Sequence, residues 1–126
     1  MKKDNRPVNL DLTQFHWPVM ALSSITHRVS GGILFVGIAF MLFALQTSLA
    51  SEEGFNEIKS MMQHPLGMFI TWGLLAALAY HFVAGIKHLF MDMGYGETLE
   101  GGAFAAKTTF LFAGILIVLA AIWVLV

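Results

Sequence analysis

The sequence predicts an all-α membrane protein with three transmembrane helices, and composition and charge distribution carry that prediction. Of the 126 residues, 57% are hydrophobic and only 12% are charged, whereas a soluble domain has about 25% charged residues. No Asp, Glu, Lys or Arg occurs in the stretches 29–51, 63–86 and 108–126. Helices of about 20 residues cross a hydrocarbon core of about 30 Å. Continuous apolar runs without alternation favour such helices over barrel strands.

The first helix is expected to run from Val19 to Leu49, with its transmembrane part at about 22–49. Pro18 disfavours helical backbone at the residue before it, so the helix begins after this proline. Ser51 follows the span and precedes a polar stretch. Its hydroxyl is suited to cap a short helix ahead of the second span.

The second and third transmembrane helices are expected at about 65–91 and 104–126. Pro65 suits the first turn of a helix, where its missing N–H costs nothing. Between the two spans the chain is expected to be broken by four glycines, Gly94, Gly96, Gly101 and Gly102. The whole chain, 1–126, is interpreted as a single membrane-anchor domain.

Lysine and arginine indicate the orientation, because cytoplasmic segments near span ends carry an excess of both. The N-terminal segment, 1–18, contains Lys2, Lys3 and Arg6, and the second loop is flanked by Lys87 and Lys107. The first loop has one lysine among three glutamates, and the C-terminus has neither lysine nor arginine. We therefore expect a cytoplasmic N-terminus and a periplasmic C-terminus in a bacterial inner membrane, although an organelle-encoded protein would have the same pattern.

Several classes of function are disfavoured by what the composition lacks. The net charge of −1 does not suggest a nucleic-acid partner. The absence of cysteine excludes disulfides, iron–sulfur ligation by this chain and covalent c-type haem attachment. No nucleophile–base pair, zinc-binding spacing or phosphate-binding glycine loop is present, so the chain alone is not expected to be an enzyme.

Three polar residues precede the first uncharged stretch: Ser24, His27 and Arg28. Their i, i+3, i+4 spacing places them near one another on a helix. A hydroxyl, an imidazole and a guanidinium together suit a carbonyl or carboxylate ligand close to the membrane interface. In the alternative interpretation, Arg28 extends to lipid phosphates and His27 lies in the headgroup layer.

His81 is different because it lies within the second span, about 24 Å of helix rise after Pro65. That depth matches the start of the first span. A neutral imidazole there is a good axial ligand for haem iron, or it hydrogen-bonds a neighbouring helix, and both interpretations stay open. Gly85, one turn later, would let a flat cofactor or a helix approach the backbone.

His88 lies about two turns after His81 on nearly the same side of the helix. These two imidazoles therefore cannot bind opposite faces of one porphyrin. A second axial ligand would have to come from His27, which is expected at the wrong end of the first span, or from another chain. We favour another chain.

Segments 6–12 (RPVNLDL), 24–30 (SITHRVS) and 81–94 (HFVAGIKHLFMDMG) resemble the signatures of the cytochrome b556 subunit of succinate dehydrogenase, the larger membrane anchor of complex II. The resemblance implies that His81 is an axial ligand of haem b, with the opposite ligand from a second, smaller anchor subunit. It implies that Ser24 and Arg28 belong to a ubiquinone site shared with the iron–sulfur subunit and the smaller anchor. It also implies that His27 lies near the haem propionates.

In that family, electrons pass from succinate through a flavoprotein subunit and iron–sulfur clusters to the quinone, so the resemblance implies these partners. Lys87 departs from the family pattern, which usually has arginine; the charge is kept but the bidentate fork is lost. Two alternatives remain: the anchor of a quinol:fumarate reductase, and a purely structural anchor without a cofactor.

Overall fold

The computed structural model describes residues 16–126. The sequence-based expectations for Lys2, Lys3, Arg6 and the segment 6–12 lie outside these residues. The described chain forms four helices: α1 (Val19–Ala50), α2 (Glu52–Gln63), α3 (Pro65–Asp92) and α4 (Leu99–Leu125). Three of them, α1, α3 and α4, are long and apolar enough to cross a membrane. The prediction of an all-α membrane protein with three spans is therefore confirmed.

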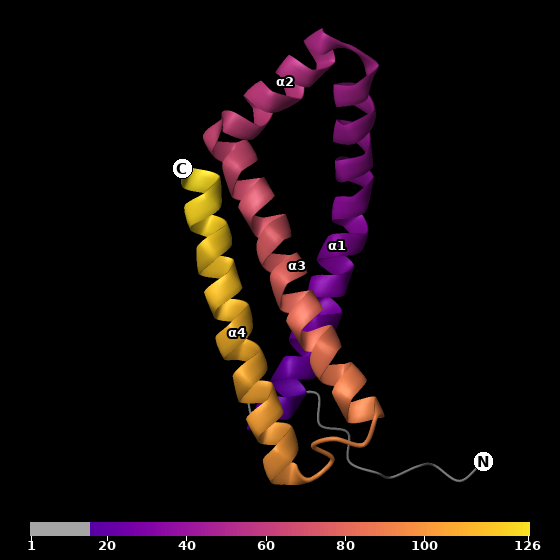
Figure 1. The fold of residues 1–126 in the computed structure, drawn as a ribbon, viewed down its shortest axis with the longest axis vertical. Coiled ribbons are helices and arrows are strands. Elements are labelled where there is room, and N and C mark those ends of the chain that lie inside the picture. Colours follow the sequence, from indigo (N-terminus) through magenta and orange to yellow (C-terminus); the bar gives the residue numbers. More distant parts are fainter. Residues whose placement is uncertain (1–15) are drawn as a thin grey trace, which may run out of the picture.

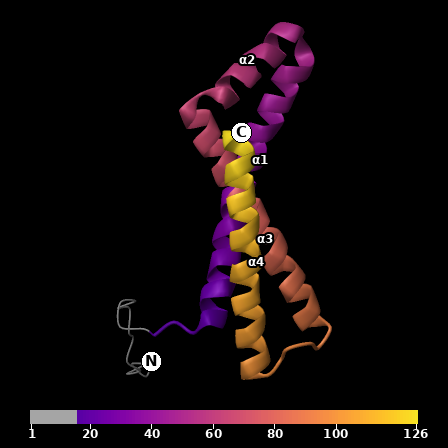
Figure 2. The same ribbon diagram turned by 60° about the vertical axis from the view of Figure 1, so that its left-hand side comes forward.

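The long helices α1 and α3 cross partway along their length, and α4 runs beside them (Figure 1). The start of α1 and the loop between α3 and α4 lie at one end of the molecule. At the opposite end α2 bridges the separated ends of α1 and α3, and the C-terminus lies near this bridge. A view turned by 60° shows α1 and α3 also diverging on the side of the α3–α4 loop, with α4 between them (Figure 2). The crossing is therefore the region in which the described long helices approach one another.

The helix boundaries follow the capping residues that the sequence indicated. α1 begins directly after Pro18. The hydroxyl of Ser51 accepts the backbone N–H of Gly54 at 3.0 Å, which caps α2. Pro65 is the first residue of α3. The expected long first helix, the short helix after Ser51 and the start of the second span are all present in the structure.

α4 begins at Leu99, ahead of the position of about 104 at which the third transmembrane span is expected to start, so the expectation that Gly101 and Gly102 break the chain is wrong. Thr98 caps the helix by accepting the backbone N–H of Gly101 at 3.0 Å. Gly101 and Gly102 are therefore helical and do not break the chain. The break comes from Gly94 and Gly96, whose φ angles of 87° and 76° lie in the left-handed region that glycine adopts at little cost.

Small residues make most of the buried contacts between the helices. The buried apolar residues of the described chain are four alanines and one tyrosine: Ala77, Tyr80, Ala84, Ala106 and Ala113. Small side chains let membrane helices approach closely, where packing and interhelical hydrogen bonds replace the hydrophobic effect. One such bond joins α3 to α4, from the indole N–H of Trp72 to the backbone oxygen of Ile117 at 3.2 Å.

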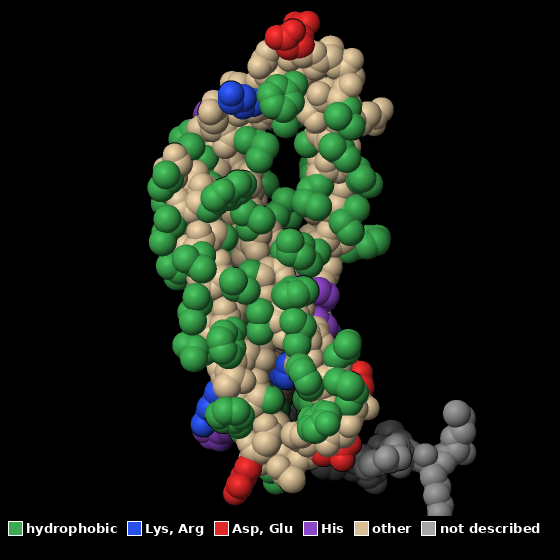
Figure 3. Space-filling model, viewed as in Figure 1, with side chains coloured by type: hydrophobic (Ala, Val, Ile, Leu, Met, Phe, Trp, Pro, Cys, Tyr) green, Lys and Arg blue, Asp and Glu red, His purple; other side chains and the backbone are tan. Residues whose placement is uncertain are grey.

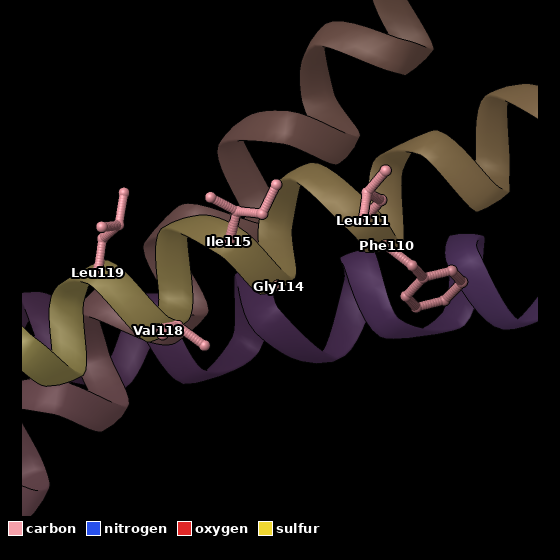
Figure 4. Close-up of a pocket in the computed structure, with 6 residues that line it drawn as sticks. All are labelled: Phe110, Leu111, Gly114, Ile115, Val118 and Leu119. Carbon is pink, nitrogen blue, oxygen red and sulfur yellow. The ribbon is translucent and has the colours of Figure 1, made fainter.

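Large apolar side chains instead cover the outer surface, as expected for a lipid-exposed protein. Figure 3 shows them over the middle of the molecule, with acidic and basic side chains toward the two ends. A shallow pocket on this surface is lined by residues of α4 alone (Figure 4): Phe110, Leu111, Gly114, Ile115, Val118 and Leu119. It contains no charged or hydrogen-bonding side chain, so we regard it as part of the lipid-facing surface.

Replacing Gly67 by alanine is expected to destabilise the corner between α2 and α3. A Cβ built on Gly67 overlaps the backbone oxygen of Met61, and a backbone atom cannot rotate away. We expect a loss of about 1–3 kcal/mol, the usual cost of overpacking, measured by denaturant titration of the purified protein in detergent. Gly73→Ala is the matched control in the same helix, because its Cβ meets no atom within 4 Å. Equal stability of the two variants would contradict the prediction.

Candidate functional site

Three imidazoles lie together where α1 packs against α3. The ring of His27 is stacked on that of His81, with centroids 4.1 Å apart and planes 16° apart. His88 lies on the other side of His27, with ring centroids 5.0 Å apart. The expectation that His27 lies at the wrong end of the first span is therefore wrong. α1 passes α3 at this level, so the beginning of one helix meets the final third of the other.

Hydrogen bonds fix the proton position on His81. Its Nδ1 lies 3.2 Å from the backbone oxygen of His27 and 3.2 Å from the hydroxyl oxygen of Ser30. The Ser30 hydroxyl donates its own proton to that same backbone oxygen at 2.8 Å. Both neighbours of Nδ1 are thus acceptors, so Nδ1 must carry the ring proton. The lone pair of Nε2 is then free to bind a ligand.

Ser30 is a site residue that the sequence analysis did not identify. It is buried, with 5% of its surface exposed, and it supplies the second acceptor for His81. The signal was present in the spacing, because Ser30 follows His27 by three residues and so lies on the same side of α1. Only the contact with His81, on another helix, shows what the hydroxyl does.

His27 contributes an unused polar atom at this site. Its Nε2 is buried and is the one buried side-chain nitrogen or oxygen among residues 16–126 without a hydrogen-bond partner. Gly85 leaves space beside it, because a Cβ there would lie 3.8 Å from this nitrogen. Gly31 similarly lies against the ring of His81, at 3.0 Å from a built Cβ to Cε1. Such a buried imidazole nitrogen is expected to pair with a group from outside the described chain.

Ser24 and Arg28 lie on α1 at the same end of the bundle, but they do not join the imidazoles. Ser24 is half-buried and Arg28 is exposed. Neither side chain forms a hydrogen bond with another described residue. Of the three residues, His27 is the one whose ring contacts the imidazoles of α3. The hydroxyl and the guanidinium are left available to a molecule outside this chain.

Lys87 takes part in a buried polar cluster that the sequence did not reveal. Only 9% of its surface is exposed, and its ammonium donates to the hydroxyl of Ser23 at 2.9 Å. Tyr80 donates to the backbone oxygen of Ser23 at 3.1 Å. The Lys87 side chain therefore lies between helices and not on the exposed surface. Its ammonium joins α3 to α1.

Comparisons with known proteins agree with the helical architecture and cover nearly the whole chain. Residues 2–122 match the family model described as "Succinate dehydrogenase/Fumarate reductase transmembrane subunit". A succinate dehydrogenase cytochrome b556 subunit of Coxiella burnetii is 42% identical over 94% of this chain and 96% of its own length. A protein of the same name from Paracoccus denitrificans is 34% identical over 79% of this chain and 77% of its own.

A mitochondrial relative is similar over a shorter range. The succinate dehydrogenase cytochrome b560 subunit of Sus scrofa is 33% identical over 75% of this chain and 57% of its own length. The match to the family model includes α1, α3, the histidine cluster and most of α4. The chain therefore belongs to the family of succinate dehydrogenase/fumarate reductase transmembrane subunits.

Proposed function

We propose that this chain is a membrane anchor of succinate dehydrogenase that binds haem b and forms part of a ubiquinone site. The observation that carries the proposal is the His81 imidazole, whose Nδ1–H is held by two acceptors and whose Nε2 is free. Ligands of metals are commonly oriented in this way, through the nitrogen that does not bind the metal. The names of the relatives, cytochrome b556 subunits, support haem b as the group that is bound.

The described residues fit a haem with one ligand from this chain. No three His, Asp or Glu side chains converge as a metal site between residues 16 and 126, so a bare metal ion is not favoured. The stacked rings of His27 and His81 leave no space for a porphyrin between them. If haem is bound, a second ligand to its iron would come from another chain, for which a second, smaller anchor subunit is the candidate. When bound, haem b accepts and donates single electrons.

His27 is proposed to hold a haem propionate. Its Nε2 is buried and has no hydrogen-bond partner among the described residues, and its ring is stacked on that of His81, the proposed haem ligand. A protonated Nε2 would donate a hydrogen bond to a carboxylate, which would remove the cost of burying an unpaired polar atom. Gly85 places no side chain beside this nitrogen, where a built Cβ would lie 3.8 Å away.

Ser24 and Arg28 are proposed to bind the quinone head group. The Ser24 hydroxyl can donate to a quinone carbonyl, and the Arg28 guanidinium is a fixed positive charge beside it. Electrons arriving from an iron–sulfur subunit place negative charge on the quinone oxygens, and a preorganised cation lowers the energy of that charge. The site would lie at the cytoplasmic side of a bacterial inner membrane, with the C-terminus of the chain in the periplasm. The relatives' names favour succinate oxidation over fumarate reduction.

Purification of the complex through a tag on this chain tests the proposed function. We expect flavoprotein, iron–sulfur and smaller anchor subunits to co-purify, together with a b-type reduced-minus-oxidised spectrum and the electron paramagnetic resonance signal of a bis-imidazole haem. The same subunits without haem would reduce the function to a structural anchor. The absence of a flavoprotein subunit would reject the assignment to succinate dehydrogenase.

Replacing Ser30 by alanine is expected to change the haem potential without releasing the haem. The variant removes one of two acceptors of the His81 Nδ1–H and keeps the other, the backbone oxygen of His27. Weaker hydrogen bonding makes the ligand less electron-donating, so the midpoint potential should rise. Redox titration of the b-type absorption measures the shift. Ser48→Ala is the control, because Ser48 bonds only Leu45 in its own helix; equal potentials in both variants would contradict a role for Ser30.

A further inference from the structure

The structure contains a groove between α3 and α4, and none of the proposed haem and quinone residues Ser24, His27, Arg28 and His81 lines it. Its volume is about 440 Å³, and it extends from the loop at Tyr95 and Gly96 toward the middle of the bundle. Its walls are mainly apolar, including Val83, Ile86 and Phe112. In the described chain, no side chain fills it. Its length and its apolar walls suit a hydrocarbon chain.

One cation lines this apolar groove, and it is Lys87. The ammonium has three donors, of which one is used by the Ser23 hydroxyl. Residues 16–126 place no carboxylate within ion-pair distance of it. A buried charge without a counter-charge is costly, so such groups are normally paired. The groove gives an anion from outside the chain a route to Lys87.

The depth of Lys87 in the membrane selects the kind of anion. α3 has 28 residues, about 42 Å of helix, which exceeds a hydrocarbon core of about 30 Å by about 6 Å at each end. Lys87 lies five residues, about 7.5 Å, before the end of α3 at Asp92. It is therefore at the boundary between hydrocarbon and headgroups, where lipid phosphates are the abundant anions.

We propose that this groove binds one anionic phospholipid, with its phosphate beside Lys87 and an acyl chain along Val83 and Phe112. Basic pockets between transmembrane helices are suited to anionic headgroups, and a lipid supplies both the counter-charge and the apolar filling. The proposal depends on the chain spanning a membrane and not on the haem or quinone assignments. The bound lipid would hold α4 against α3.

Lipid retention by the purified complex tests this site. The complex is delipidated in detergent, reconstituted with equal amounts of spin-labelled phosphatidylglycerol or phosphatidylcholine, and assayed for immobilised lipid. We expect the wild type and Lys87→Arg to hold phosphatidylglycerol preferentially. In Lys87→Met, the ratio of immobilised phosphatidylglycerol to phosphatidylcholine should fall by about fivefold, because that is the contribution of one lysine near an anionic headgroup. Lys107→Met is the control, since it removes the same charge from a nearby exposed lysine that does not line the groove.

A second variant covers the case in which Lys87→Met fails to assemble. Ala105→Phe leaves Lys87 in place and fills the groove, which Ala105 lines, so it should also release the lipid. Retention of phosphatidylglycerol by both variants, or no preference in the wild type, would overturn the proposal. Displacement by millimolar inorganic phosphate would indicate a site for free anions. Cross-linking of a Phe104→Cys variant to another subunit would indicate that a protein segment fills the groove.

Discussion

Replacing His81 by leucine is expected to abolish the low-spin b-type absorption of the purified complex while the chain remains in the membrane. Leucine keeps an apolar side chain in α3 but has no atom that can bind iron. Both hydrogen-bond acceptors of His81 contact Nδ1, which leaves Nε2 free. Under the proposed function, the substitution would remove the only ligand that this chain gives to the haem iron. We expect haem affinity to fall by at least about tenfold. Even the loss of a residue that only hydrogen-bonds a metal ligand lowers metal affinity by about this factor.

His88→Leu is the matched control for this experiment. It makes the same substitution in the same helix, and His88 also contacts the ring of His27. It lies too far along α3 to replace His81. Difference spectra and haem content per complex should be close to wild type for His88→Leu. If both variants lose haem equally, disturbed packing explains the loss. If His81→Leu keeps normal low-spin absorption, the axial assignment is wrong.

Replacing Arg28 by leucine is expected to lower succinate:quinone reductase activity by about 100-fold, while haem content stays near normal. Loss of one preorganised charge at a developing anion costs about 3 kcal/mol in the transition state. Arg28 is exposed and forms no hydrogen bond with another described residue, so its removal breaks none of the hydrogen bonds that hold His81. The assay compares quinone reduction with reduction of a soluble dye by succinate, which does not need the quinone site.

Two further variants separate charge from geometry at Arg28. Arg28→Lys keeps the charge but loses the planar fork, so its activity should fall between those of wild type and Arg28→Leu. Lys107→Leu removes a positive charge at the same end of the bundle and should leave quinone reduction unchanged. Unchanged quinone reduction in Arg28→Leu would defeat the quinone assignment. A parallel loss of dye reduction would show that the complex had failed to assemble.

The sequence predicted the transmembrane spans because the features that produce a span act within a single helix. A helix must satisfy its own backbone in lipid, so uncharged runs such as 63–86 indicate transmembrane helices without knowledge of neighbours. Ser51 and Pro65 marked boundaries because capping and proline geometry act within one turn. Gly101 and Gly102 do not break the chain as expected, because glycine is tolerated in a helix once a capping residue such as Thr98 has started it.

The sequence by itself determined the number of spans, their helical form and the residues available for chemistry at one end of the bundle. Only the tertiary structure decided which of these residues meet: His27 with His81, Ser30 with the same imidazole, and Lys87 with Ser23. The physical reason is that contacts between helices depend on crossing angle and helix rotation. In a core packed by alanine and glycine, those are set by the fit of whole surfaces and not by any local pattern.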